Sequence, residues 1–210
     1  MKKGQQTKNN ILQSGARIVH QSGYNNTGIQ QILKSAGVPK GSFYFYFRNK
    51  QDFGLQLIDY YANFFYSRLD NYLQNLDNSP LNRLRSFFSE FIQELEDNKC
   101  QGGCPLGNLS QELGDTNEVF REKLNQIFLQ IRCKIGEFLI LAKEQNEISD
   151  KYDPQDLAHF ILNSWQGALL QMKVSKTMDP LKNFDNLVFK TILNQGGHDA
   201  GPFISTHKHQ

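Results

Sequence analysis

Apolar residues recur along most of the chain at spacings of three and four, which is the period of a helix buried on one face. No segment of useful length alternates apolar and polar residues as a half-buried strand would. The pattern therefore predicts an all-α fold. The predicted helices cover about residues 7–22, 27–36, 39–46, 49–76, 79–97 and 117–145, with further helices starting near residues 105, 153 and 179.

Turn and capping residues set the expected helix ends. Gly23 and Gly37 are predicted to end the first two helices in the left-handed conformation, which glycine adopts at little steric cost. Thr27 with Gln30 matches a capping box for the second helix, and Pro39 suits the first turn of the third. Three later helices are expected to carry N-caps at Asn49, Asp153 and Asp179.

The charge is unevenly distributed, although the net charge is only +2. Residues 1–52 hold eight basic residues against one acid, a charge of +7, and the remainder holds 15 basic and 20 acidic residues, a charge of −5. A basic end on an acidic body is typical of a nucleic-acid-binding module joined to a different domain. We expect a DNA-binding domain over residues 1–52, a helical regulatory and dimerisation domain over 53–195, and a disordered tail over 196–210.

Several classes of protein are disfavoured. The longest apolar runs are a few residues, such as 138–142, so no membrane span is predicted, and the polar N-terminus lacks the apolar core of a signal peptide. Three cysteines at these spacings favour neither a disulfide framework nor a zinc site. No nucleophile paired with a histidine and no phosphate-binding glycine loop is evident, so we expect a cytoplasmic protein that is not an enzyme and needs no cofactor. His20 and His159 are interpreted as ordinary packing or surface residues.

Two short helices joined by the tight turn 36–38, after one supporting helix, form a helix-turn-helix pattern. The sequence that follows is more specific: Val38-Pro39-Lys40-Gly41-Ser42-Phe43-Tyr44-Phe45-Tyr46-Phe47, then Asn49-Lys50. Five consecutive aromatic residues cannot all face inward on a helix, so part of this segment must be exposed. The alternative is a purely structural aromatic core segment.

Over residues 7–60 this pattern closely resembles the TetR family of bacterial transcription regulators. Two residues depart from the family's pattern: Leu33 stands where alanine is common, and Gln30 stands where many members carry Arg or Lys. The resemblance implies a DNA-binding dimer with a small-molecule effector and operator DNA as partners.

The recognition segment supplies the predicted DNA contacts. Lys40 and Ser42 lie in the N-terminal part of the recognition helix, which contacts base edges in the major groove, and Gly41 permits close approach of the backbone. Tyr44 and Tyr46 can donate to phosphate oxygens. The full predicted set is Thr27, Gln30, Lys40, Gly41, Ser42, Tyr44, Phe45, Tyr46 and Lys50. Phe43 and Phe47 are assigned to the core of the module.

In TetR-like proteins the last two long helices pair with a partner chain in a four-helix bundle. The stripes that permit this here consist of Leu157, Phe160, Ile161, Ala168 and Leu169, then Phe184, Leu187 and Val188. The alternative is that both stripes belong to the chain's own core. The effector cavity is predicted among Phe64, Phe87, Phe91, Phe128 and Trp165, although aromatic residues at helical spacing are more often plain core.

Cys104 directly precedes Pro105 and so lies at the start of a helix, where free amides and the helix dipole favour a thiolate. Lys99 is near in sequence, and Gly102 and Gly103 are expected to keep the loop accessible. Residues 103–109 and 171–175 resemble a TetR subgroup that includes the repressor of N-ethylmaleimide reductase.

That resemblance implies that Cys104 responds to electrophiles and oxidants and that Lys173 approaches its thiol. Cys100 is a candidate resolving thiol, while Cys133 is expected to be inert. The alternatives are a structural cysteine beside a conventional apolar ligand pocket, or a body that binds another protein.

Overall fold

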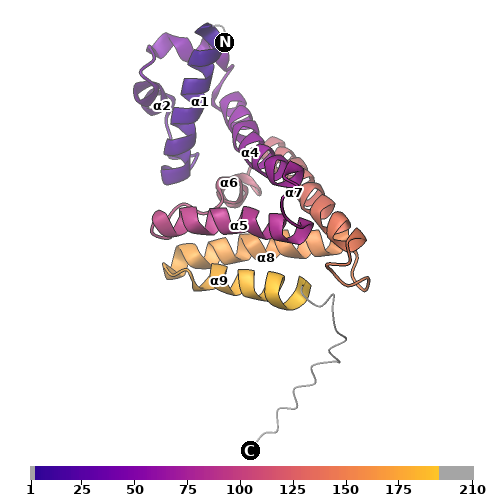
Figure 1. The fold of residues 1–210 in the computed structure, drawn as a ribbon. Coiled ribbons are helices and arrows are strands. Elements are labelled where there is room, and N and C mark those ends of the chain that lie inside the picture. Colours follow the sequence, from indigo (N-terminus) through magenta and orange to yellow (C-terminus); the bar gives the residue numbers. More distant parts are fainter. Residues whose placement is uncertain (1–2, 194–210) are drawn as a thin grey trace, which may run out of the picture.

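The computed structural model describes residues 3–193 and contains helices but no strand over that range, which confirms the all-α prediction. A small N-terminal unit lies above a larger body, and α4 runs from one to the other (Figure 1). No helix within residues 3–193 is long and apolar enough to cross a membrane. The predicted tail over residues 196–210 lies outside the described residues.

The N-terminal unit contains α1 (Lys3–Ser22), α2 (Ile29–Ala36), the 3₁₀ turn η1 (Lys40–Ser42) and α3 (Phe43–Tyr46). Its core is aromatic: the ring centroids of Phe43 and Phe47 are 5.0 Å apart, and both rings contact Phe53 from the first turn of α4. Gly15 leaves room on α1 for the Phe53 ring, which would collide with any larger residue there. The unit is therefore closed by a residue of α4, just beyond the predicted domain boundary.

The predicted turns are confirmed, and two details of the helix ends are wrong. Gly23 and Gly37 both adopt left-handed backbone conformations, with φ of 84° and 65°. α1 begins four residues earlier than predicted, at Lys3. Thr27 does not cap α2, whose N-cap is Gly28, because the Thr27 hydroxyl is buried and donates to the carbonyl of Gly23 at 2.6 Å.

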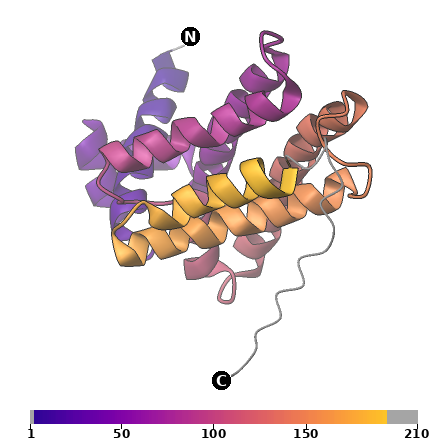
Figure 2. The same cartoon turned by 60° about the horizontal axis from the view of Figure 1, so that its bottom comes forward.

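The body contains α4 (Lys50–Gln74), α5 (Pro80–Asp97), α6 (Pro105–Leu113), α7 (Glu118–Glu144), α8 (Pro154–Ser175), α9 (Asp179–Asp185) and the π-helix η2 (Asn186–Ile192). The short α6 lies between the N-terminal unit and the layer formed by α5 and α8 (Figure 1). α8 and α9 lie side by side on the face turned away from the N-terminal unit (Figure 2). This arrangement places α6 between the two parts of the molecule.

The N-caps of the body agree with the predictions except at α9. Asn49 accepts from the Asp52 amide at 2.8 Å, and Asp153 accepts from the Gln155 amide at 2.8 Å. Asp179 is instead the first residue of its helix, and Met178 occupies the cap position with no side-chain hydrogen bond. Beyond Asp185 the helix widens into η2, a form associated with functional segments and local strain.

The predicted dimer stripe on α8 and α9 is largely wrong. Most of its members are buried within the chain's own core: Leu157, Ile161, Leu169, Phe184 and Val188. Ala168 is half-buried. Only Phe160 and Leu187 are exposed, at 47% and 48%, and they are joined by the unpredicted Leu170 and Val174. Helical period identifies an apolar face but cannot distinguish the face toward the core from one toward a partner.

Candidate nucleic-acid interface and effector cavity

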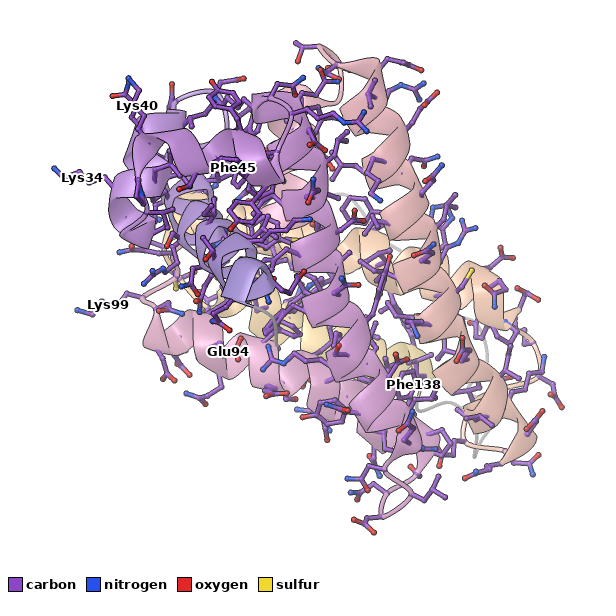
Figure 3. The ribbon with its side chains drawn as sticks, turned by 90° about the horizontal axis from the view of Figure 1, so that it is seen from above. Lys34, Lys40, Phe45, Glu94, Lys99 and Phe138 are labelled. Atoms are coloured by element: carbon purple, nitrogen blue, oxygen red, sulfur yellow. The ribbon has the colours of Figure 1, made fainter. Side chains whose placement is uncertain are left out.

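The aromatic segment 43–47 divides into an inner and an outer face. Phe43 and Phe47 are buried as predicted, whereas Tyr44 and Phe45 are 67% and 86% exposed. Lys34 and Lys40 project outward from the same unit (Figure 3). Phe45 thus lies almost wholly outside the core, while the Tyr44 ring touches the core only through Phe43, at a centroid distance of 5.5 Å.

The other predicted DNA contacts differ in accessibility. Gln30 and Gly41 are exposed, and a Cβ at Gly41 would meet no other atom within 4 Å. Ser42 and Tyr46 are half-buried. Thr27 is fully buried with its hydroxyl bonded, so it cannot contact a duplex in this conformation.

Lys50 is held at the joint between the N-terminal unit and the body. Its ammonium lies 4.7 Å from the centroid of the Tyr24 ring and donates to the carbonyl of Asn25 at 3.3 Å. Burial lowers the pKa of Lys50, and the nearby Glu112 opposes that shift. Lys50 therefore has a structural contact as well as any contact it makes to phosphate.

A cavity of about 330 Å³ opens between α1, α4, α5, α8 and the loop before α6. Phe64, Phe91 and Trp165 line it as predicted. Phe87 instead borders a much smaller neighbouring void, and Phe128 does not line this cavity. Tyr60, Tyr61 and Phe65 complete an aromatic wall that sequence periodicity could not distinguish from core.

The cavity also has a side formed by α1, which the sequence interpretation did not anticipate. Ala16, Arg17 and His20 line it, so the N-terminal unit contributes directly to the cavity. The His20 ring packs against Gly102, and its Nδ1 is buried with no hydrogen-bond partner among the described residues. Burial, assisted by the charge of Lys173, lowers the pKa of His20. His20 is thus a packing residue, which is one of the two expected roles, and it also lines the cavity.

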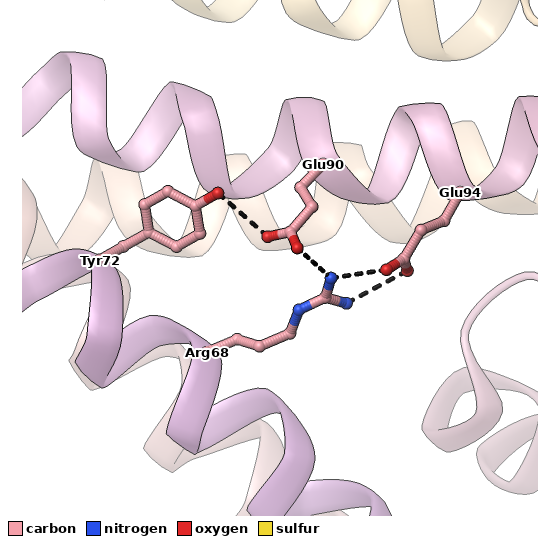
Figure 4. Close-up of polar contacts among 4 residues, drawn as sticks. All are labelled: Arg68, Tyr72, Glu90 and Glu94. Atoms are coloured by element: carbon pink, nitrogen blue, oxygen red, sulfur yellow. Dashed lines mark hydrogen bonds and ion pairs between the residues drawn. The ribbon is translucent and has the colours of Figure 1, made fainter.

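A group of polar side chains centred on Arg68 joins α4 to α5 at the edge of this cavity. The Arg68 guanidinium bonds the Glu94 carboxylate at 2.5 and 3.1 Å and Glu90 at 2.5 Å, and Tyr72 donates to Glu90 at 3.0 Å (Figure 4). The guanidinium also lies 4.8 and 4.3 Å from the ring centroids of Phe64 and Phe91. Glu94, the acidic side chain in the cavity lining, is therefore ion-paired, although it shares the single guanidinium with Glu90.

Cys104 occupies the N-cap position of α6, as predicted, but its environment does not favour the thiolate. Its sulfur accepts from the Gly107 amide at 3.4 Å. Burial raises the pKa of the Cys104 thiol, and the hydrogen bonds from Gly107, Gln166 and Leu106 oppose this only partly. Desolvation of the thiolate outweighs the helix terminus here, so the prediction of a lowered pKa is wrong.

The groups predicted to assist Cys104 are dispersed. Lys99 is exposed and points away from the body (Figure 3). The Cys100 sulfur is buried 3.4 Å from the Met178 sulfur, which gives no support to a resolving role. Lys173 does border the same small cleft as Cys104, and its ammonium donates to Asn108 at 3.1 Å. The exposed thiol is that of Cys133 on α7.

One carboxylate connects α6 to the N-terminal unit. Glu112, in the last turn of α6, accepts from the backbone amides of Tyr24 and Asn25 at 2.8 and 2.6 Å. Gly23 allows this approach, because a Cβ there would lie 3.2 Å from the carboxylate. Since Cys104 begins the same helix, α6 runs from the cavity to the loop that follows α1. No sequence motif marks Glu112, because its partners are backbone amides about 90 residues away.

The sequence matches two family models. Residues 11–56 match the family described as "Bacterial regulatory proteins, tetR family". Residues 80–188 match the domain described as "Tetracyclin repressor-like, C-terminal domain". Together they cover both the helix-turn-helix unit and most of the body.

The chain is similar to named regulators over most of their own lengths, and to a solved structure over nearly all of it. The transcriptional regulator AcuR of Cereibacter sphaeroides is 36% identical over 83% of this chain and 80% of its own. The transcriptional repressor DhaR of Mycobacterium sp. (strain GP1) is 32% identical over 89% of this chain and 92% of its own. The crystal structure of reduced NemR from E. coli superposes with a TM-score of 0.83, at 27% identity over 90% of this chain and 98% of that one.

The Glu112 contact leads to the first testable prediction. Glu112→Gln keeps one acceptor oxygen but removes the charge and the second acceptor, so we expect a loss of about 1–3 kcal/mol in the free energy of unfolding. Hydrogen exchange at the Tyr24 and Asn25 amides should accelerate. Urea denaturation and NMR-detected exchange measure these effects. Glu96→Gln, at an exposed glutamate of α5, is the matched control. Unchanged exchange at both amides would contradict the assigned contact.

Proposed function

Because the chain belongs to the TetR family of bacterial regulatory proteins and is a transcription regulator, we propose that it acts as a repressor. In this proposal it binds operator DNA as a homodimer in the cytoplasm. An effector that enters the aromatic cavity releases it. The observation that carries the DNA-binding part is the outward presentation of Tyr44 and Phe45 by a buried aromatic core, beside the exposed Lys40.

The proposed DNA surface consists of α2 and the segment around η1 and α3. Lys40 and Gly41 are at the exposed N-terminal end of the recognition segment, where side chains contact base edges. Tyr44 has a free edge for a phosphate contact, and Phe45 offers an apolar surface suited to a thymine methyl group. Gln30, Ser42, Tyr46 and Lys50 complete the set, from which Thr27 is omitted because it is buried.

The proposed dimer face follows an exposed stripe on α8 together with η2. Phe160, Leu170 and Val174 share that side of α8 with Gly167, because the four positions are spaced seven, three and four residues apart. Leu187 extends the apolar surface onto η2. Gly167 has open space where a Cβ would be, so a partner helix can approach closely. Burial of these side chains by a second copy would hold two recognition segments at the spacing of operator half-sites.

Effector release is proposed to pass through α6. The cavity borders the first residues of α6 at Cys104 and Pro105, and Glu112 at its other end holds the loop after α1. An effector that shifts α6 would therefore move the N-terminal unit relative to the body. A difference of about 1–3 kcal/mol in effector affinity between the DNA-bound and released states is an ordinary coupling.

Modification of Cys104 is a second candidate trigger. The thiol lines the cavity and caps α6, so an apolar electrophile that occupies the cavity meets it directly. Addition of the sulfur to the electrophile would place new bulk at the start of α6. Because the thiol is buried and its pKa is raised, we expect this reaction to be slow at neutral pH and faster as the pH increases.

DNA binding is tested with operator fragments selected from the source genome. Lys40→Ala and Tyr44→Ala should each weaken binding by roughly tenfold or more, and Lys40→Ala should also relax sequence preference, because it removes a base contact. Fluorescence anisotropy over a salt series measures both effects. Lys151→Ala, at an exposed lysine of the body, should bind like the wild type. If no fragment binds with salt-dependent selectivity, the proposal is wrong.

The dimer face is tested by introducing charge. Leu170→Glu combined with Leu187→Glu should yield a folded monomer, because two carboxylates would be buried against a partner. Light scattering after size exclusion gives the mass, and circular dichroism checks folding. Leu129→Glu, at a comparably exposed leucine of α7, should remain dimeric. A dimeric double variant would exclude this face.

The thiol trigger is tested in a Cys133→Ser background, which removes the exposed cysteine. N-ethylmaleimide should then release operator DNA slowly, at a rate that rises with pH because only the thiolate reacts. Adding Cys104→Ser should abolish this release. Equal release from the Cys104→Ser protein would show that Cys104 is structural and that a reversibly bound ligand is the effector.

A further inference from the structure

The cavity has an apolar end and a basic end. Its wall toward α4, α5 and α8 is aromatic and includes Tyr60, Phe64, Phe91 and Trp165. Polar side chains gather on the opposite side, where Arg17 and His20 lie three residues apart on α1. A ligand that fills this space must therefore present an apolar body to one side and a polar group to the other.

One cation that lines the cavity, Arg17 on the α1 side, has no carboxylate partner within residues 3–193. Glu94 is held by the Arg68 guanidinium, and Glu112 accepts two backbone amides. Arg17 has no ion pair or hydrogen bond among the described residues, and Lys173 bonds only the neutral amide of Asn108. An anionic group on the ligand would compensate this charge, whereas a cationic group would increase the repulsion.

His20 lies within the same region and lacks a partner. Its imidazole is neutral near pH 7, because burial and the charge of Lys173 lower its pKa, and a neutral imidazole still carries one N–H donor. Its Nδ1 is buried without a hydrogen bond among the described residues. An unpaired buried nitrogen is costly, which makes a ligand oxygen a favourable partner after a small rotation of the ring.

We propose that the effector is a compact amphipathic monocarboxylate whose carboxylate binds Arg17 and His20 on α1 and whose apolar body packs against the aromatic wall. This inference rests on the proposed effector role of the cavity and specifies its ligand class. The volume of about 330 Å³ is at the small end of small-molecule sites, which favours a single ring or a short chain over a long acyl chain.

Such a ligand would contact the helix-turn-helix unit directly. Arg17 and His20 belong to α1, which packs on α2, while Trp165 belongs to α8 of the body. The carboxylate end would therefore bind one moving part and the apolar end the other. The ligand would bind most tightly to the relative position of the two parts in which both of its ends make their contacts. If that position differs from the DNA-bound one, the difference in ligand affinity drives release from DNA.

The test uses two probes of the same shape, 4-phenylbutyrate and its neutral amide 4-phenylbutyramide. Trp165 is the single tryptophan of the chain and lines the cavity, so its fluorescence reports occupancy. The protein carries Cys104→Ser to exclude covalent reaction. We expect the carboxylate to bind at least tenfold more tightly than the amide and to release operator DNA at concentrations where the amide does not.

Substitutions in α1 test which residues cause the preference for the carboxylate over the amide. Arg17→Gln should reduce carboxylate affinity by fivefold or more while leaving amide affinity within twofold. His20→Phe should weaken both probes, because the oxygen of either can accept the imidazole N–H. Lys34→Gln removes an equal charge from the same unit away from the cavity and should change neither affinity.

Different results would overturn the carboxylate site, the ligand class and the effector role of the cavity. Equal binding of the two probes, or a carboxylate preference that persists in Arg17→Gln, would overturn the head-group site while the cavity remains the effector site. Tighter binding of 4-phenylbutylamine than of the carboxylate would overturn the proposed ligand class. If no probe changes Trp165 fluorescence or the midpoint of thermal unfolding, the effector role of the cavity itself is overturned.

Discussion

α4 carries one continuous hydrophobic core from the N-terminal unit into the body, and this constraint governs the relation between the two parts of the molecule. Its first turn contributes Phe53 to the aromatic core of the helix-turn-helix unit. At the next residue, Gly54, a Cβ would collide with both Tyr24 and Phe120, so glycine permits the unit and α7 to meet on the same helix. A continuous helix of 25 residues, about 37 Å long, then extends into the body. The recognition segment therefore cannot move without displacing packed side chains in the body.

The second connection between the two parts is polar, and it differs in kind from the first. Glu112 on α6 holds two backbone amides of the loop after α1, whereas α4 holds the unit by apolar packing. Hydrogen bonds to a carboxylate depend steeply on geometry, so a small shift of α6 weakens them more than it disturbs buried rings. The two parts are thus joined by apolar packing at α4 and by a hydrogen-bonded contact at α6, with the cavity between α1 and the body.

Burial decides the chemistry of the groups around the cavity. The helix terminus at Cys104 supplies the amide donors that favour a thiolate, yet removal from water raises the pKa of the thiol. The same effect keeps His20 neutral. Arg68 retains its charge because two carboxylates and two aromatic faces replace its hydration. A ligand in this region therefore interacts with neutral or paired groups, apart from Arg17 and Lys173 on the α1 side.

The sequence alone determined the features that depend on near neighbours in the chain. Helical period predicted the all-α fold, and Asn49 and Asp153 predicted the starts of α4 and α8, because each of these features rests on contacts within a few residues. Only the tertiary structure decided which apolar stripe of α8 faces outward, that Thr27 is buried, that His20 lines the cavity and that Glu112 bonds the loop after α1. Those outcomes depend on the packing of segments distant in sequence, whose mutual placement no local pattern specifies.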